Sequence, residues 1–253
     1  MVGNLLLRGM LVGVLAGILV FAFAHTFGEP LVDSAIAFED QMAQMKGEMP
    51  EPELVSRATQ AGPGLLVAAV VYAAALGGLF ALVFAFVYGR VSPLGARGTA
   101  ALLALAAFVV IALVPDIKYP ANPPAVGNPD TIAVRTELFF VMIVVSIAAM
   151  VGAVALTKRL APQHGIWNAV IYSGIAFVLV VGVVQYLMPP INEVPEQFSA
   201  VVLWRFRATS LGMHVILWTT LGLGFGAWAS RLLGETRKYP AAASRSGLAP
   251  RRS

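Results

Sequence analysis

Long apolar segments with almost no charge are the feature that most constrains what this chain can fold into. Most hold about 20 residues, the length that a helix needs to cross the hydrocarbon core of a bilayer. The strands of a membrane barrel would alternate apolar and polar residues, so these segments predict helices. We predict an all-α membrane protein with six spans, at residues 5–24, 65–87, 100–114, 138–156, 166–187 and 211–232.

The composition supports lipid as the natural solvent. Of the 253 residues, 58% are hydrophobic and 12% are charged, which is about half the charged fraction of a typical soluble domain. The chain has no cysteine, which excludes disulfides and thiolate metal sites. It also lacks a P-loop and the common hydrolase motifs. We therefore expect no enzyme activity, no tightly bound cofactor and no nucleic-acid partner.

The distribution of charge predicts the orientation. If the N-terminus is cytoplasmic, 11 of the 17 lysines and arginines lie inside and six lie outside, as the positive-inside rule requires. The chain then forms three outward hairpins, with outer loops at 25–64, 115–137 and 188–207. Residues 1–233 are the membrane domain, and 234–253 are a basic cytoplasmic tail that we predict to be disordered. Of the 13 acidic residues only Glu235 falls inside, so the outer face attracts cations.

Two features of the spans allow alternatives. An A-x-A pattern at residues 22–24 is typical of a signal-peptide cleavage site. The spacing of Gly9, Gly13 and Gly17 favours instead a retained helix that packs against another helix. The texts RATQAG, RTE and RATSLG, which open three helices, indicate either an internal hairpin repeat or three separate helix starts with an interfacial arginine and a capping threonine.

The first outer loop contains a predicted helix. Apolar residues from Leu31 to Met45 recur at helical spacing, which predicts an amphipathic helix lying on the outer surface. Pro30 disfavours the α conformation at Glu29, so we expect this helix to be separate from the first span.

Three stretches resemble a known family. They are RGMLVGVLAGILVFAFAHTFGEPLVDSAIAFED, PDIKYPANPPAVGNPDTIAVRT and NAVIYSGIAFVLVVGVVQYLMPPINEVPEQFSAVVLWRFRATSLGMH. Together they resemble the bacterial CbtA family, a probable cobalt transporter subunit. The resemblance implies a multi-pass protein of the bacterial inner membrane, linked to cobalt and cobalamin supply. It implies a small one-span partner with a histidine-rich end, CbtB, and a transported divalent ion such as Co²⁺. The family is often drawn with five spans, and whether the chain forms a homo-oligomer stays open.

Four side chains are candidate metal ligands in the outer half of the membrane domain. They are His25, Glu29, Asp116 and His214, because Co²⁺ favours imidazole and carboxylate ligands. The alternative is that the histidines only form hydrogen bonds between helices. His164, in a short inner loop, is expected to be an interfacial residue. Two further alternatives for the whole chain stay open: a non-transporting accessory subunit, and a haem protein that uses His25 and His214 as a pair.

Arginines mark the outer membrane boundary. Arg57, Arg135 and Arg207 form a candidate ionic collar with Glu137. Carboxylates that neutralise them would turn them into struts for the outer loops, whereas unpaired arginines would bind an anion. The second outer loop is stiffened by Pro120, Pro123, Pro124 and Pro129. Its Asn122 and Asn128 side chains and its backbone carbonyls are candidates for replacing ion hydration.

Overall fold

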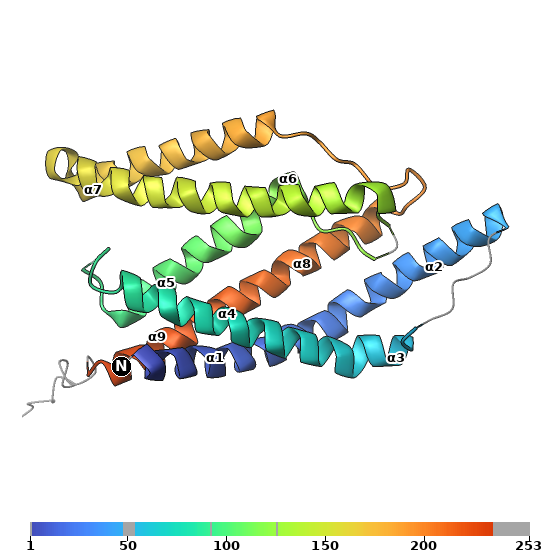
Figure 1. Cartoon of the computed structure of the whole chain (residues 1–253), viewed down its shortest axis with the longest axis horizontal. Coiled ribbons are helices and arrows are strands. Elements are labelled where there is room, and N and C mark those ends of the chain that lie inside the picture. Colours follow the sequence, from blue (N-terminus) through green and yellow to red (C-terminus); the bar gives the residue numbers. More distant parts are fainter. Residues whose placement is uncertain (1, 48–53, 92, 125, 235–253) are drawn as a thin grey trace, which may run out of the picture.

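Helices make up almost the whole structure. The computed structural model describes residues 2–47, 54–91, 93–124 and 126–234, and it has no strand within them. The helices run roughly along one direction (Figure 1). The α-helices are α1 (Val2–Phe23), α2 (Glu29–Lys46), α3 (Arg57–Thr59), α4 (Leu65–Val87), α5 (Ala96–Ala107), α6 (Val114–Lys118), α7 (Pro129–Leu187), α8 (Ala200–Thr220) and α9 (Gly226–Leu232). Four π-helical turns join some of them: η1 (Ala24–Gly28), η2 (Gln60–Gly64), η3 (Phe108–Leu113) and η4 (Leu221–Phe225).

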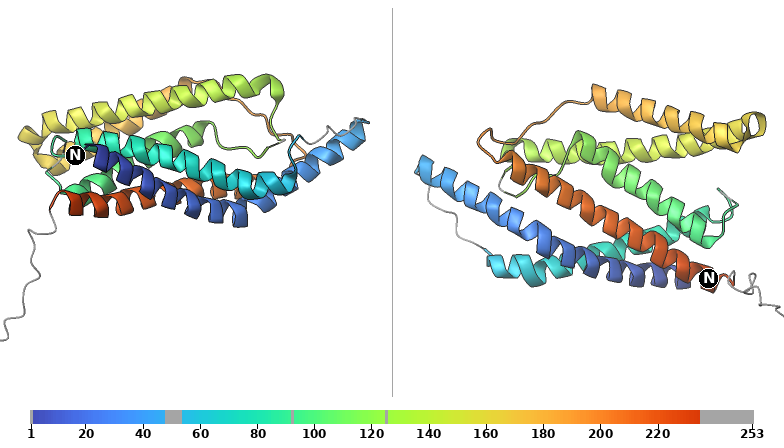
Figure 2. Two further views of the ribbon diagram at one scale, coloured as in Figure 1. Left: turned by 60° about the horizontal axis from the view of Figure 1, so that its bottom comes forward. Right: turned by 180° about the vertical axis from the view of Figure 1, so that it is seen from behind.

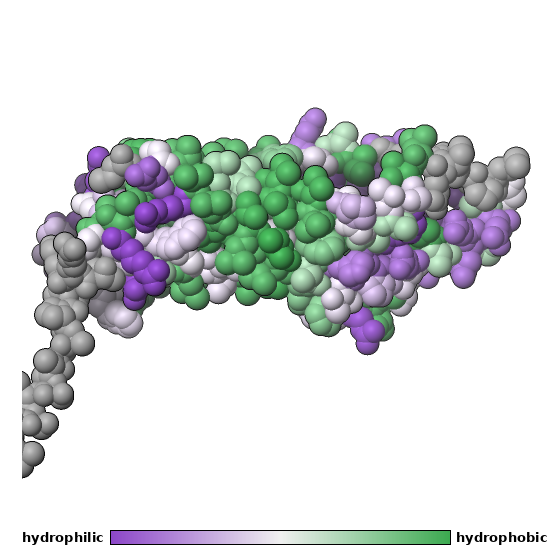
Figure 3. Space-filling view, turned by 90° about the horizontal axis from the view of Figure 1, so that it is seen from below, coloured by the Kyte–Doolittle hydropathy of each residue, from purple (hydrophilic) through white to green (hydrophobic). Residues whose placement is uncertain are grey.

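Five helical segments are long and apolar enough to cross a membrane. They are Val2–Lys46, Arg57–Val87, Ala96–Lys118, Asp130–Leu187 and Ala200–Leu232. The molecular surface agrees with this assignment, since a broad apolar region lies between two polar ends (Figure 3). The helices also extend further into the predicted outer loops than the sequence indicates, and α8 already begins at Ala200.

The sequence predicts six spans, and the difference lies in α7. A straight helix of 58 residues would be about 87 Å long. The backbone departs from helical geometry at Gly165, where φ is 75° and ψ is 157°. A glycine is needed there because the left-handed region is costly for other residues. The ribbon of α7 folds back on itself at this bend (Figure 1), between the predicted spans 138–156 and 166–187.

The two legs of α7 pack against each other. Met142 from the first leg and Val181 from the second leg share one hydrophobic cluster with Val114 of α6. The hydroxyl of Ser146 donates to the carbonyl of Val110 in η3 at 2.5 Å. In the described part of the chain α7 packs mainly against α6 and η3. Only 11% of its most apolar window is buried, against 28–33% in the other four segments.

Glycines of α1 set its distance from α4. Gly9, Gly13 and Gly17 are all buried, and a methyl group at any of them would collide with α4. At Gly17 the added carbon would lie 2.6 Å from the Cα of Val70. Gly77 of α4 faces the Gly9 backbone in the same way. Helices come this close only where side chains are absent, so α1 and α4 form the tightest pair in the described structure.

The first span does not end where the sequence indicates. We expected a loop from residue 25 and no helix at Glu29, and both expectations are wrong, because α1, η1 and α2 form one helical segment of 45 residues. The π-helical turn η1 precedes Pro30, which occupies the first turn of α2. A proline inside a helix removes one backbone hydrogen bond and its ring crowds the preceding turn, and the wider π-helical turn before Pro30 accommodates both effects.

The long first segment carries α2 beyond the membrane. A helix of 45 residues is about 67 Å long, whereas a hydrocarbon core is about 30 Å thick. The ribbon of α2 continues outward from α1 (Figure 1) and is not a separate surface helix. Its Ala35 and Phe38 pack against Phe198, with the two phenyl rings edge to face at 5.2 Å. Residues 235–253 of the predicted tail lie outside the described residues.

The α1–α4 contact generates a test of packing. Gly13→Ala places a methyl group against the backbone of Ala73 and Ala74, so we expect it to lower the free energy of unfolding by about 1–3 kcal/mol. Gly152→Ala in α7 is the matched control, because no atom lies within 4 Å of the added carbon. Thermal unfolding in detergent would measure both variants, and equal melting temperatures would contradict the packing role of Gly13.

Candidate functional site

A polar pocket lies where α6, α7 and α8 meet beneath the connection 119–128. Its volume is about 360 Å³. Asp116 comes from α6, Arg135 from α7, and Ser210 and His214 from α8, while Asn122 belongs to the connection itself. Polar side chains from the continuous stretch 116–140 and from α8, which is distant in the sequence, thus converge at one place. This convergence makes the pocket the leading candidate for a functional site in the described structure.

Two arginines hold the connection over the pocket. The Arg207 side chain donates from Nε to the carbonyl of Ala121 at 3.3 Å, and from Nη2 to Oδ1 of Asn122 at 3.0 Å. The Arg135 guanidinium donates to the carbonyl of Pro120. A proline-rich segment has few N–H groups of its own, so its carbonyls need donors from elsewhere. The arginines supply these donors and fix the segment in place.

Asp116 lies at the centre of the charged groups. Its Oδ1 accepts a hydrogen bond from the N–H of Ala121 at 3.0 Å. The carboxyl also interacts electrostatically with His214, Arg207 and Arg135. The Nδ1 atom of His214 is buried and has no hydrogen-bond partner in the described residues. A buried imidazole nitrogen without a partner is costly unless a ligand, an ion or water completes it.

The connection 188–199, between α7 and α8, is tied to the same part of the molecule. Glu193 is almost fully buried, with 1% of its side chain exposed, and its Oε2 lies 3.4 Å from Nη1 of Arg135. Its Oε1 accepts from the hydroxyl of Thr131 at 2.8 Å. The hydroxyl of Tyr119 donates to the carbonyl of Pro189 at 2.9 Å. Burial raises the pKa of Tyr119, so the phenol keeps its proton at neutral pH and remains a donor.

The structure separates the four predicted metal ligands into two pairs. His214 and Asp116 share the polar pocket. Glu29 instead pairs with Arg57, and the Nδ1 atom of His25 lies 3.0 Å from the carbonyl of Ala61. Within the described ranges, no group of three or more His, Cys, Asp or Glu side chains could hold a metal ion. The prediction that His25 and His214 share one site, completed by Glu29 or Asp116, is not met in the described residues, because His25 and Glu29 have partners in η2 and α3.

The three arginines of the predicted collar have different partners. Arg57 pairs with Glu29 and also with Asp33, at 3.0 Å. The partner of Arg135 is Glu193, whereas Glu137 is exposed on α7. Arg207 makes no ion pair at salt-bridge distance in the described residues, and its direct partners are the oxygens of the connection 119–128.

Sequence reasoning missed Tyr119, Ser210 and Thr131. Each of them lies beside a residue that was a candidate by charge, but a lone hydroxyl carries no signal that separates a pocket from a helix surface. The proline-rich sequence of the outer connections was the signal from which this site could have been predicted. It indicates a rigid segment whose carbonyls need outside donors, but it does not indicate which donors.

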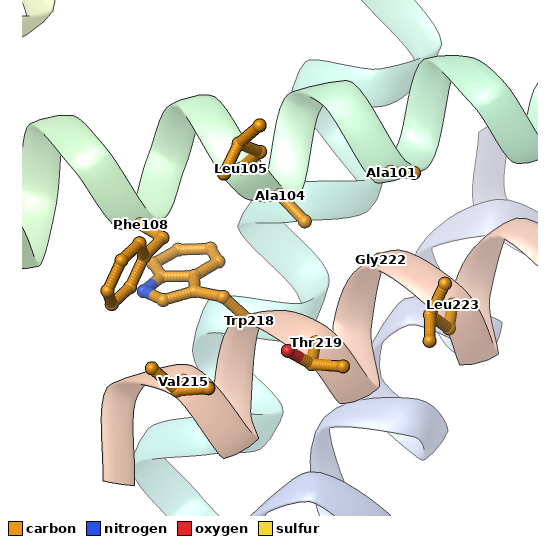
Figure 4. Close-up of a pocket in the computed structure, with 9 residues that line it drawn as sticks. All are labelled: Ala101, Ala104, Leu105, Phe108, Val215, Trp218, Thr219, Gly222 and Leu223. Atoms are coloured by element: carbon orange, nitrogen blue, oxygen red, sulfur yellow. The ribbon is translucent and has the colours of Figure 1, made fainter. Parts of the chain in front are cut away.

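A second hollow, of about 310 Å³, is apolar and lies between α5 and the α8–η4 segment. Figure 4 shows the small residues Ala101, Ala104 and Gly222 along its walls, with the Trp218 indole at one end. Trp218 is buried, and its Nε1 donates to no acceptor in the described residues. We call this hollow the apolar groove. The small residues allow α5 and η4 to approach closely, since a carbon added at Gly222 would lie 2.7 Å from the Cβ of Ala104.

The clamp on the connection 119–128 generates a test by amide exchange. Arg207→Ala removes two hydrogen bonds to the connection, each worth about 0.5–1.5 kcal/mol. We expect the amides of Ala121 and Asn122 to exchange with deuterium roughly ten times faster. Arg205→Ala is the matched control, because Arg205 is exposed on the same helix. Unchanged exchange after Arg207→Ala would contradict the clamp.

Comparison with known proteins assigns the chain to a family. The model of the CbtA family, described as a probable cobalt transporter subunit, matches residues 2–230. No curated protein and no solved structure gives a significant match. The family match covers every helix that lines the polar pocket and the apolar groove. The chain therefore belongs to the CbtA family of probable cobalt transporter subunits, and its apolar helices make it a multi-pass membrane protein.

Proposed function

We propose that this chain is the membrane-embedded subunit that conducts Co²⁺, or a similar divalent ion, through the polar pocket. The observation that carries the proposal is the pairing of His214 with Asp116 in one pocket, together with the unpartnered Nδ1 of His214. Co²⁺ favours imidazole and carboxylate ligands. The identity of the proposed ion rests on membership of the CbtA family.

The charge balance of the pocket suits a passing cation. Arg135 and Arg207 alone would repel a divalent ion, but Glu193 neutralises Arg135 and Asp116 interacts with both arginines. The guanidinium groups of Arg135 and Arg207 also donate to the connection 119–128, and Arg135 pairs with Glu193. A site that is close to neutral, with one free imidazole nitrogen, binds weakly enough to release the ion again.

The membrane topology forms part of the proposal. Residues 1–233 cross the bacterial inner membrane six times, with both termini in the cytoplasm and three outward hairpins. The bend of α7 at Gly165 supports two crossings in this helix, because a helix of this length is far longer than a bilayer is thick. The surplus of basic residues at the end that carries the N-terminus supports the orientation.

A small subunit with one span and a histidine-rich end is the proposed partner. The family is one of transporter subunits, and this chain offers fewer than three close metal ligands within its described residues. Histidines of the partner complete the ligand set. The apolar groove between α5 and α8 is the docking position, since Leu105, Val215 and Leu223 along it are apolar and exposed.

A non-transporting accessory role is the second candidate. The observation in its favour is the lack of a complete metal site in the described residues. The haem alternative has less support, because His25 binds Ala61 and does not line the pocket of His214. Uptake measurements on pocket variants separate transport from an accessory role.

The pocket generates a test of transport. We expect His214→Ala to reduce cobalt uptake roughly tenfold or more in cells that express the chain with its partner, because it removes the imidazole ligand. His164→Ala is the control, because His164 is exposed near the α7 bend and uptake should not change. Membrane content of each variant, measured by immunoblot, excludes a folding defect. Equal uptake by wild type and His214→Ala would refute the role of the pocket.

The topology generates a second test. The natural chain lacks cysteine, so single cysteines report one position each. Asn128→Cys and Asn192→Cys should react with a membrane-impermeant maleimide from outside intact cells. Gln163→Cys, near the α7 bend, should react only after the membrane is opened. Labelling of all three from outside would contradict two crossings by α7.

A further inference from the structure

The end of the molecule that carries the N-terminus is basic and has no acidic counterpart in the described residues. Figure 1 places the N-terminus, the connection from α4 to α5 and the bend of α7 at this end, which we call the basic end. The sequence segments 1–8, 88–99, 157–165 and 226–234 contain no Asp or Glu. They contain six cations: Arg8, Arg90, Arg97, Lys158, Arg159 and Arg231. Counterions for these cations must come from outside these segments.

Two of the cations converge from elements that hardly touch elsewhere. The Nζ atom of Lys158 in α7 donates to the backbone carbonyl of Arg90, after α4, at 2.9 Å. The Arg90 guanidinium uses one nitrogen to donate to the carbonyls of Phe86 and Ala85, at 2.8 and 3.3 Å. An ammonium has three donors and a guanidinium five. Most of these donors have no acceptor among the described residues.

Other arginines at this end are tied to helices. Arg8 donates to the carbonyl of Trp228 at 3.0 Å, and Arg97 donates to the hydroxyl of Ser230 at 3.2 Å. These bonds join α1 and α5 to α9. Arg90 and Lys158 differ from them because their bond joins the segment after α4 to α7, which packs mainly against α6 and η3.

The ribbons of α5 and α7 diverge toward the basic end (Figure 2), and apolar side chains on both helices are exposed there. We call this exposed apolar region the wedge. Contacts of α7 with the other helices concentrate on η3 and α6, and nothing lies within 4 Å of a carbon added at Gly152. Val151 on α7 is 65% exposed and Leu102 on α5 is 52% exposed. Leu102 lies two helical turns before Val109, which packs with the α7 cluster, so Leu102 is on the side of α5 that faces the wedge.

We propose that this wedge binds an anionic phospholipid, whose phosphate is held by Arg90 and Lys158 and whose acyl chains lie between α5 and the first leg of α7. Charge complementarity selects the headgroup, since the four segments of the basic end supply cations and no carboxylate of their own. The exposed Val151 and Leu102 select acyl chains over a soluble anion. The lipid fills the space that leaves α7 the least buried of the candidate spans. It therefore anchors α7 to the rest of the molecule at the basic end.

The test titrates the purified full chain in detergent with short-chain phosphatidylglycerol, and with phosphatidylcholine of the same chain length. We expect phosphatidylglycerol to raise the melting temperature and to remain bound in native mass spectra, whereas phosphatidylcholine does neither. Lys158→Gln and Arg90→Gln should each weaken binding roughly tenfold, as expected for the loss of one charged hydrogen-bond donor. Both side chains are exposed, so their melting temperatures without lipid should stay close to that of the wild type.

Two further arms make the test decisive. Arg205→Gln, at the opposite end of the molecule, should bind phosphatidylglycerol like the wild type. Inorganic phosphate should not reproduce the stabilisation, because it lacks acyl chains. The proposal is overturned if both lipids stabilise equally, if phosphate alone is sufficient, or if Arg205→Gln loses as much affinity as Lys158→Gln.

Discussion

The hydrogen bonds of Arg135 and Arg207 to the connection 119–128 are the interaction on which the outer part of this molecule depends. A proline-rich segment that covers a membrane protein has carbonyl groups but few amides with which to pair them. Arg135 donates a hydrogen bond to the carbonyl of Pro120, and Arg207 donates to the carbonyl of Ala121 and to the side chain of Asn122. Because these donors come from α7 and α8, the connection cannot shift without moving two helices. Asp116 and His214 lie beneath it in a pocket whose shape this clamp maintains.

The same arginines explain why the pocket suits a cation although it contains two positive charges. Glu193 is buried against Arg135, and Asp116 balances the charge near Arg207. Both arginines donate to oxygens of the protein and lie near carboxylates, so the pocket is close to neutral and attracts an anion only weakly. The buried Nδ1 of His214 has no hydrogen-bond partner among the described residues. A neutral imidazole is a ligand for a transition-metal ion and a poor one for an alkali cation.

Much of the fold could be predicted from the sequence, because apolar runs and glycine spacing act locally. The helical class and the packing surface of Gly9, Gly13 and Gly17 depend on such patterns. The continuous helix through Pro30 could not be predicted, because it depends on a π-helical turn that no simple periodicity reveals. The partners of the arginines could not be predicted either, since Glu193 and Glu137 are equivalent by charge and only tertiary packing separates them. The internal hairpin repeat remains a prediction.

The account rests on the claim that this chain carries the ion pathway but completes its metal site only together with a partner. Uptake of radioactive cobalt into proteoliposomes that contain the chain alone, the one-span partner alone, or both would test this claim most directly. The account predicts uptake well above that of empty liposomes only when both proteins are present, and its loss when the chain carries His214→Ala. Equal uptake by the partner alone and by the pair would contradict it, because the pathway would then lie outside this chain.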